Sequence, residues 1–221
     1  MKKIIILTLI SLSVNIVIAQ KSMTIGPYYS LGTSTIMSGN SMGMGSSMMN
    51  GTGGMSNKLS CGTGIRDDMF FNNHWGMYIQ TGFQQRGGMY KQYVDTYKPR
   101  YKLDYWDINI GAQYKTKGIM KGHQFIINLG LTQHTLLQAN RVYDMGSDNM
   151  NGNFGNIDFG LFVGIGGNIP LFDKDLFQLL LFYNQGFSQM YTGNMLMNNM
   201  SGRNLLFGIQ TAYLIGKPSK K

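Results

Sequence analysis

The segment WGMYIQTGFQQR, residues 75–86, decides the fold. Its odd positions are mostly large and apolar, whereas its even positions hold glycine, tyrosine, glutamine and arginine. A period of two is typical of a β-strand whose two faces meet different surroundings. The segment therefore predicts a strand with one apolar face and one small or polar face.

The same alternation recurs along the rest of the chain. Together with the first segment it predicts eight strands, at residues 22–31, 58–66, 75–86, 106–115, 124–131, 157–166, 176–187 and 204–213. After residue 19 no stretch reaches the roughly 20 apolar residues that a spanning helix needs. In lipid, only helices and closed barrels satisfy every backbone hydrogen bond. The sequence thus predicts an all-β fold, an eight-stranded antiparallel up-and-down transmembrane β-barrel.

The connections between these strands alternate in length. Long ones are expected at residues 32–57, 87–102, 132–155 and 188–202, and short ones at 67–74, 116–122 and 167–175. In bacterial barrels long loops lie outside the cell and short turns lie in the periplasm. We therefore expect the cell outer membrane as the location, with both termini periplasmic. Aromatic girdles are expected from Tyr29, Tyr101, Tyr105 and Trp106 at the outer rim, and from Trp75, Tyr114 and Tyr213 at the inner rim.

The first residues fit export from the cytoplasm. Lys2 and Lys3 precede a mostly apolar stretch over residues 4–18, and Ala19 is a small residue suited to cleavage. This pattern predicts a signal peptide at residues 1–19 and a barrel domain at residues 20–221. Cys61 is the only cysteine, so no internal disulfide is expected.

The inward faces predict a filled lumen. An eight-stranded barrel is only just wide enough for its own side chains, and inward glycines leave room for long neighbours. Charged residues on these faces would need partners to be tolerated there. We expect a polar network rather than an open pore, formed by Arg66, Arg86, Asp107, Lys115 and Asp158.

No enzyme motif is found. His74, His123 and His134 are expected at strand ends and lack the spacing of metal ligands, and the chain contains no glutamate. No serine lies in a nucleophile elbow. The net charge of +9 is not gathered into a nucleic-acid-binding motif. We expect neither an enzyme, a cofactor nor a nucleic-acid partner.

Methionine is concentrated in the predicted long loops. Thioether sulfurs suit Cu(I), and the Met-x-Met pairs could supply several of them to one soft metal ion: Met42, Met44, Met195 and Met197. The alternatives are an adaptable binding surface for an extracellular protein or glycan, and loop residues without a specific role.

The second long loop is basic and aromatic. Lys91, Lys98, Arg100 and Lys102 alternate there with tyrosines. Such a cluster could meet anionic lipopolysaccharide head groups or acidic glycans. It could also be an ordinary solvated rim.

Several strands resemble a known family. The segments MYIQTGFQQR (77–86), LDYWDINIGAQY (103–114) and RNLLFGIQTAYL (203–214) resemble strands of the PorT-like outer-membrane β-barrel proteins of Bacteroidetes. Residues 158–166 followed by 176–185 resemble another strand pair of that family. The resemblance implies the same barrel fold. It also allows a part in protein secretion or envelope assembly.

The sequence favours a monomeric, non-enzymatic outer-membrane barrel with a structural or binding role through its long loops. Outer-membrane lipid is its expected surrounding, with an extracellular protein or glycan as a possible partner. The alternatives are a binder of a small ligand, soft metal, lipid or glycan, an accessory of secretion or envelope assembly, and a soluble secreted barrel of the lipocalin type. The last would carry its apolar residues inside.

Overall fold

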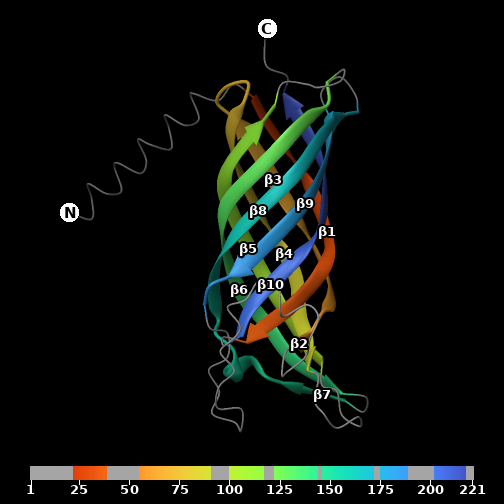
Figure 1. Cartoon of the computed structure of the whole chain (residues 1–221), viewed down its shortest axis with the longest axis vertical. Helices are drawn as coiled ribbons and strands as arrows, with labels where there is room; N and C mark the ends of the chain where they lie inside the picture. The colour runs from red at the N-terminus through yellow and green to blue at the C-terminus, as the bar shows by residue number, and fades with distance from the viewer. Residues whose placement is uncertain are drawn as a thin grey trace, which may run out of the picture.

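A computed structural model shows the strands wound into one tall barrel (Figure 1). The structure describes residues 22–38, 55–90, 100–116, 122–143, 146–171, 175–188 and 202–217. Eight strands form the wall: β1 (Ser22–Ser38), β3 (Lys58–Phe70), β4 (Trp75–Tyr90), β5 (Arg100–Lys115), β6 (Gln124–Tyr143), β8 (Ile157–Pro170), β9 (Asp175–Gly186) and β10 (Gly202–Lys217). Three short elements are added at one end: β2 (Met55–Ser56), β7 (Gly146–Asn149) and the 3-10 turn η1 (Asn151–Asn153).

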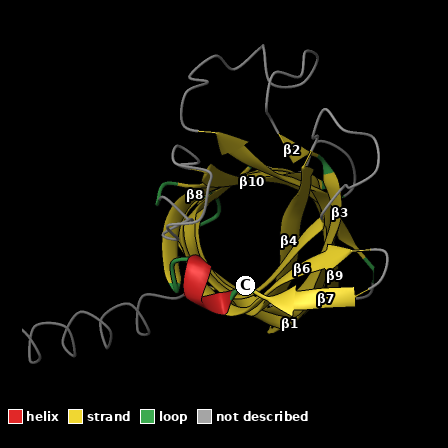
Figure 2. Cartoon of the chain, turned by 90° about the horizontal axis from the view of Figure 1, so that it is seen from below, coloured by secondary structure: helices red, strands yellow, loops and turns green. Residues whose placement is uncertain are grey.

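The barrel is closed. Each wall strand pairs antiparallel with the next wall strand along the chain, and β10 pairs with β1, with Leu31 opposite Ile209. Figure 2 shows the resulting ring from below. Closure leaves no unpaired strand edge, so the backbone groups of the wall are satisfied within the protein. The predicted eight-stranded fold is confirmed. Among the described residues, no helix is long and apolar enough to cross a membrane.

The outer surface of the wall is apolar and the interior is largely polar. Leu131 and Leu59 are 68% and 67% exposed, whereas Arg66, Gln113 and Asn128 are fully buried. This distribution suits a wall surrounded by lipid. It is the reverse of a soluble secreted barrel, so the lipocalin-type alternative is wrong.

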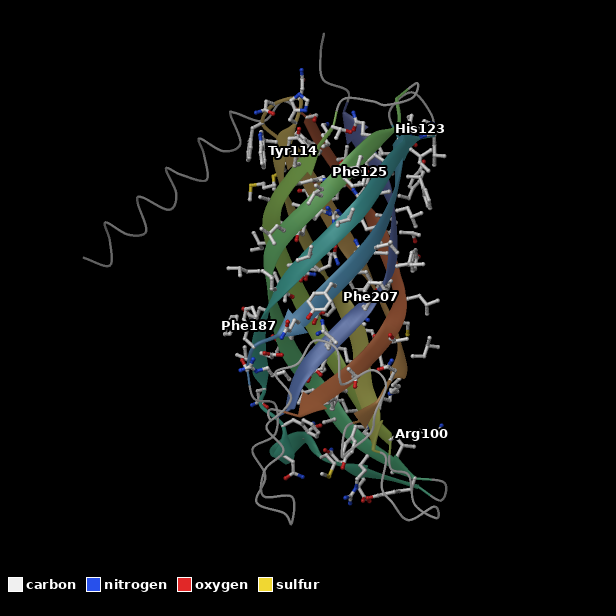
Figure 3. All side chains as sticks on the ribbon, in the orientation of Figure 1. Arg100, Tyr114, His123, Phe125, Phe187 and Phe207 are labelled. Atoms are coloured by element: carbon white, nitrogen blue, oxygen red, sulfur yellow. The ribbon has the colours of Figure 1, made fainter. Side chains whose placement is uncertain are left out.

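The two ends of the barrel differ. One end, here called the terminal end, holds the first residue of β1, the last of β10 and the turn at residues 71–74, and Figure 3 places Tyr114 and Phe125 there. The other end, the loop end, holds β2, β7 and Arg100 (Figures 1 and 3). At the terminal end the outward-facing Trp75 and Tyr114 rings meet edge to face, with centroids 4.9 Å apart. These two aromatics lie where the inner girdle was expected.

Most wall strands are longer than predicted. β1 continues to Ser38, β4 to Tyr90 and β6 to Tyr143, and β5 already begins at Arg100. The turn between β3 and β4 is only residues 71–74, instead of 67–74. The physical reason is that strand pairing needs no apolar face. Backbone hydrogen bonds continue past the point where the apolar alternation stops.

The outer girdle was partly mispredicted. Tyr101 and Tyr105 face the interior and are 7% and 0% exposed, while Trp106 faces outward. Neighbouring residues of a strand point to opposite faces, so Tyr105 and Trp106 cannot both meet lipid. Tyr29 faces outward, but it lies near the middle of the longer β1 and not at its end.

A small extension rises from one side of the loop end. We call residues 100–104 of β5, 138–143 of β6 and β7 the loop-end extension. β8 pairs with β6 only as far as Thr135, whereas β5 follows β6 to Val142 and β7 follows it to Tyr143. A register shift beside Tyr105 leaves Leu137 without a partner on β5, so Ala139 faces inward. Bulges of this kind re-aim the residues that follow them.

Candidate functional site

The buried charges of the lumen form two separate groups rather than one network. The first lies in the terminal half and contains Arg66. The second lies towards the loop end and contains Arg86 and Asp107. The aromatic residues Tyr78, Phe162 and Phe182 pack together with Leu206 in one buried cluster. Tyr78 of this cluster contacts Arg66, while Phe162 is paired in register with Asn184 of the second group, so the cluster lies between the two.

In the first group, Arg66 pairs with Asp68 of the same strand. The distance from Arg66 Nε to Asp68 Oδ1 is 2.8 Å, and both side chains are buried. The guanidinium also lies 4.5 Å from the centroid of the Tyr78 ring and donates to Gln80 Oε1 at 3.3 Å. The other carboxylate oxygen, Oδ2 of Asp68, accepts hydrogen bonds from Gln113 at 3.3 Å and from Gln178 at 3.0 Å. The partner of Arg66 is therefore local, and amides from across the barrel donate to that partner, while Nη2 of Arg66 has no hydrogen-bond partner among the described residues.

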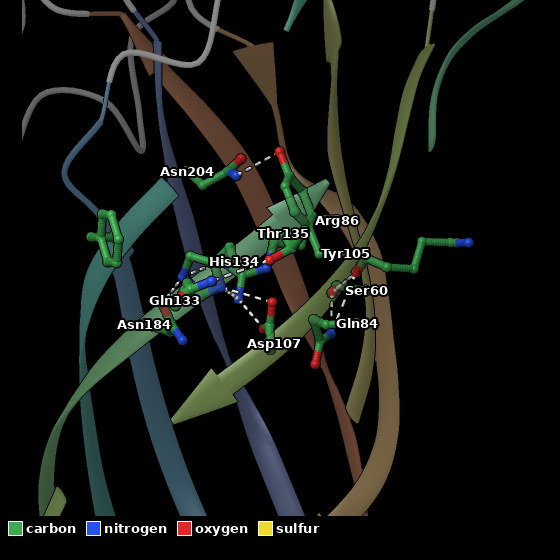
Figure 4. Close-up of polar contacts among 12 residues, drawn as sticks. Ser60, Gln84, Arg86, Tyr105, Asp107, Gln133, His134, Thr135, Asn184 and Asn204 are labelled. Carbon is green, nitrogen blue, oxygen red and sulfur yellow. Dashed lines mark hydrogen bonds and ion pairs between the residues drawn. The ribbon is translucent and has the colours of Figure 1, made fainter. Parts of the chain in front are cut away.

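In the second group, three strands contribute one charged or titratable residue each (Figure 4). Arg86 Nη2 lies 2.6 Å from Asp107 Oδ2, and His134 Nδ1 lies 2.7 Å from Asp107 Oδ1. Because a carboxylate only accepts, Nδ1 donates to Asp107 in this contact, so Arg86 Nη2, which lies 3.1 Å from the same nitrogen, cannot also donate to it. The far ring nitrogen, Nε2, lies 3.2 Å from Asn184 Oδ1. The group holds two buried charges that contact each other directly, as a low-dielectric interior requires, while Nε of Arg86 has no hydrogen-bond partner among the described residues.

Lys115 and Asp158, the other two residues expected in the network, form no ion pair with either group, although Asp158 lies opposite His134 in the register of β6 and β8. Lys115 is partly buried in the terminal half, with Nζ 3.5 Å from the centroid of the Phe70 ring. Asp158 lies towards the loop end, where its Oδ1 accepts from the Ser188 backbone N–H at 2.9 Å. Within the described part of the chain, neither side chain forms an ion pair.

Two residues that complete the charged groups were not predicted. Asp68 was assigned to a short turn and His134 to a long loop. The available signal was the alternation itself: Asp68 follows Arg66 at the strand period, and His134 follows Asn128 and Thr132 on the inward face. Their roles depend on which side chains meet across the barrel, and no spacing along the chain encodes that.

Inward glycines leave room for the large side chains that fill the lumen. A Cβ atom on Gly82 would lie 2.7 Å from the Tyr28 hydroxyl, and one on Gly130 would lie 2.5 Å from the Tyr78 hydroxyl. Such distances are shorter than real carbon contacts, so a side chain at either position would displace a tyrosine. The glycines and tyrosines therefore occupy one shared space.

The loop end is covered on one side by the chain that follows β7. Met150 and Phe154 are buried there against the inward-facing Tyr101 and Leu103. Three hydrogen bonds tie the segment down: Met150 N–H to Ala139 O (2.8 Å), Ala139 N–H to Asn151 Oδ1 (2.6 Å) and Leu136 N–H to Asn156 O (2.8 Å). The loop end thus has an ordered apolar side.

The proposed metal ligands Met42, Met44, Met195 and Met197 lie outside the described residues. Within the described ranges, no group of three or more histidine, cysteine or acidic side chains could hold a metal ion.

Comparison with known proteins gives a consistent result. The family model described as outer membrane protein beta-barrel domain matches residues 18–192. OprG from Pseudomonas aeruginosa is 12% identical, with 89% of this chain and 95% of that chain covered and a TM-score of 0.53. Neisserial surface protein A is 13% identical, with 87% and 96% covered and a TM-score of 0.47. Ail of Yersinia pestis is 13% identical, with 88% and 98% covered and a TM-score of 0.43. No curated protein matches the sequence. At this identity the likeness to OprG shows the fold alone.

Proposed function

The chain belongs to the family of outer membrane protein beta-barrel domains, and from that premise we propose that it is a non-enzymatic barrel whose loop end is a binding surface. Its place is the outer membrane, with lipid around the wall. One observation carries the proposal: the lumen is occupied by paired charges and packed aromatic side chains. The wall then serves as a rigid support, and recognition falls to the residues at its loop end.

The packing of the lumen argues against conduction. Arg66, Arg86 and Tyr78 are among the largest fully buried side chains. Eight-stranded barrels are generally filled by their side chains, and water-filled channels belong to much larger barrels. Moving Arg86 aside would separate it from Asp107 inside a low-dielectric interior, which is costly. Solute passage through the barrel is therefore disfavoured.

The surroundings of His134 argue against hydrolytic chemistry. The hydrogen-bond contacts described for its ring are with Arg86, Asp107 and Asn184. None of these carries a hydroxyl or thiol that an imidazole could activate as a nucleophile. The ring is also fully buried. Its contacts suit a role in holding β4, β5, β6 and β9 together.

The orientation follows the usual rule for such barrels. We place the terminal end, with its short turn at residues 71–74, in the periplasm and the loop end outside the cell. Cleavage of residues 1–19 as a signal peptide belongs to the same proposal. A monomer is the expected state, because a closed barrel has no free strand edge.

The test distinguishes the contribution of the long loops to binding from that of the barrel wall. The first variant replaces the long connections 39–54 and 189–201 by short Gly-Ser linkers, and the control replaces only the short turn 71–74. Both should keep the heat-dependent gel mobility of a folded barrel, and only the first should lose binding to envelope glycans or surface proteins. The same preparations in planar bilayers should show no steady conductance. A steady open channel, or unchanged binding after loop replacement, would contradict the proposal.

A second candidate rests on the PorT-like resemblance of residues 77–86 and 203–214. It is a part in protein secretion or envelope assembly, in a bacterium of the Bacteroidetes. Deletion of the gene should then lower the amount of secreted protein in the medium. Normal secretion, with the loop-binding phenotype retained, would remove this candidate and keep the first.

Soft-metal binding by the methionine loops stays a proposal of its own. Titration with Cu(I) should show binding tighter than micromolar, abolished when Met42, Met44, Met195 and Met197 become leucine. Leucine keeps the apolar bulk and removes the sulfur ligands. Equal binding by the parent and the leucine variant would end the idea.

A further inference from the structure

We propose that the outward face of the loop-end extension binds the phosphate groups of an anionic glycolipid in the outer leaflet. The inference deepens the proposed function and rests on it, because it takes the loop end as the outer side. It concerns the side of the extension that faces away from the barrel axis. The residues that carry it are Arg100, Lys102 and Trp106.

Towards the loop end, the outward-facing residues of β5 change from apolar to charged, in the same order in which a lipid changes from acyl chains to head group. Ile110 and Trp106 lie in the exposed apolar surface of the wall. Asp104, Lys102 and Arg100 follow at the same strand period, with Arg100 at the loop end (Figure 3). Acyl chains favour the first kind of residue, the membrane interface favours tryptophan, and charged head groups favour the last. One row of one strand thus matches the profile of a single lipid molecule.

The cations of the outward row of β5 remain accessible. Lys102 Nζ lies 3.6 Å from Asp104 Oδ2, and 41% of the Lys102 side chain is exposed. Asp104 is itself buried and accepts a hydrogen bond from Gln85 at 3.1 Å. Arg100 is exposed, whereas Lys58 is only partly exposed and its Nζ donates to the Tyr101 carbonyl at 3.3 Å. Arg100 and Lys102 therefore share this row with one carboxylate, Asp104, which leaves a net positive charge on the row.

The geometry favours lipid over a protein partner approaching from above. The inward face of the extension is already covered by Met150 and Phe154. Arg141, also on the extension, is paired with Asp148 at 2.9 Å. Arg100 and Lys102 instead lie on the outward row of β5, just beyond the apolar wall, where the head groups of surrounding lipids lie. Arginine matches the geometry of phosphate oxygens with two parallel hydrogen bonds, and lysine adds a point charge.

The chain offers a matched control on the other side of the barrel. Arg203 is exposed near the loop end of β10, and β10 is separated from β5 by three strands in either direction around the ring. Arg203→Ala and Arg100→Ala each remove one exposed arginine from the same rim. Nonspecific attraction to an anionic micelle would respond equally to both changes.

The experiment measures binding of diphosphoryl lipid A to the refolded protein in neutral detergent. The chain has two tryptophans, so a Trp75→Phe background lets fluorescence report on Trp106 alone. We expect Arg100→Ala to weaken binding roughly fivefold and Arg100→Ala with Lys102→Ala by tenfold or more, whereas Arg203→Ala changes it less than about twofold. Monophosphoryl lipid A should bind more weakly than the diphosphoryl form. Heat-dependent gel mobility verifies that each variant is folded.

Several outcomes would overturn the inference. These are no saturable lipid A binding by the parent protein, an equal loss in Arg100→Ala and Arg203→Ala, or phosphatidylglycerol binding as tightly as lipid A. Inorganic phosphate binding at the same strength, with the same dependence on Arg100, would assign the site to free phosphate instead.

A separate measurement isolates the orientation. A thiol introduced by Ser147→Cys on β7, in a Cys61→Ser background, should react with a membrane-impermeant reagent on intact cells. If it does not react while lipid A binding in detergent persists, the orientation is wrong and the phosphate site stands. If it reacts while Arg100→Ala has no effect, the orientation stands and the lipid site is wrong.

Discussion

The lumen and the loop-end extension each hold an arginine–aspartate ion pair of similar length but very different surroundings. Arg86 and Asp107 are 2.6 Å apart with side chains 0% and 5% exposed. Arg141 and Asp148 are 2.9 Å apart with side chains 34% and 53% exposed. From distance alone, the two ion pairs would be expected to contribute equally to stability. Burial makes their contributions to stability different. Water solvates the charges of the exposed pair and would still solvate them if the pair separated, whereas the buried charges have no such compensation.

The comparison also separates two kinds of structural role. The lumen pair is joined by His134 and Asn184, so it connects strands β4, β5, β6 and β9. The extension pair is supplemented by the Tyr143 hydroxyl, which donates to the same carboxylate oxygen of Asp148 at 2.6 Å. We expect stability to depend on the first pair and local order at the rim to depend on the second.

The largest effect is expected from Asp107→Ala. The change leaves the buried Arg86 guanidinium without its carboxylate, and breaking a buried pair in this way costs about 3–5 kcal/mol. Urea unfolding in lipid vesicles, followed by tryptophan fluorescence, measures the loss. Asp148→Ala is the matched control and should unfold at nearly the parent urea concentration. Equal midpoints for the two variants would refute the distinction.

The next variant tests whether stability requires the Arg86–Asp107 ion pair itself, or is lost only when one of the two charges is left unpaired. Arg86→Met combined with Asp107→Leu replaces both charges by apolar side chains, which removes the unpaired charge. We expect this double variant to be at least about 2 kcal/mol more stable than Asp107→Ala alone. A double variant as unstable as the single one would show that the remaining polar contacts of His134 need the pair.

A smaller effect is expected at the other lumen group. Asp68→Asn removes the charge but keeps an oxygen for Arg66, which also retains Gln80 and the Tyr78 ring. The expected loss is about 1–3 kcal/mol, typical of a weakened charged hydrogen bond in a buried site. The same urea measurement applies. A loss as large as that of Asp107→Ala would mean that the local pair and the cross-strand pair contribute alike.

The smallest effect concerns pH at the exposed pair. The Tyr143 hydroxyl, followed by the Arg141 guanidinium, holds the pKa of Asp148 below its usual range. A lowered folded pKa stabilises the extension above the ordinary aspartate value of about 3.9, and the stabilisation is lost as pH falls towards the lower folded pKa. Tyr143→Phe should move the pKa of Asp148 upward, measured by NMR titration of the carboxyl carbon. An unchanged titration in that variant would assign the shift to Arg141 alone.

The candidate site was only partly predictable. The alternation placed Arg66, Arg86 and Asp107 on inward faces, because a strand fixes which residues share a side. It did not reveal that Arg66 pairs with Asp68, whereas Arg86 pairs with Asp107 and contacts His134. Those partners depend on how far each strand is shifted against its neighbours, and that shift is a property of the closed barrel.

The sequence by itself determined the number of wall strands, their inward and outward faces, and a closed barrel in lipid. These follow from a period of two and from the need to satisfy every backbone hydrogen bond in the membrane. Only the tertiary structure decided where the strands end, which charges meet, and that Met150 and Phe154 cover Tyr101 on one side of the loop end. Strand pairing continues where the apolar pattern has stopped, and side chains far apart in the chain become neighbours only when β10 closes on β1.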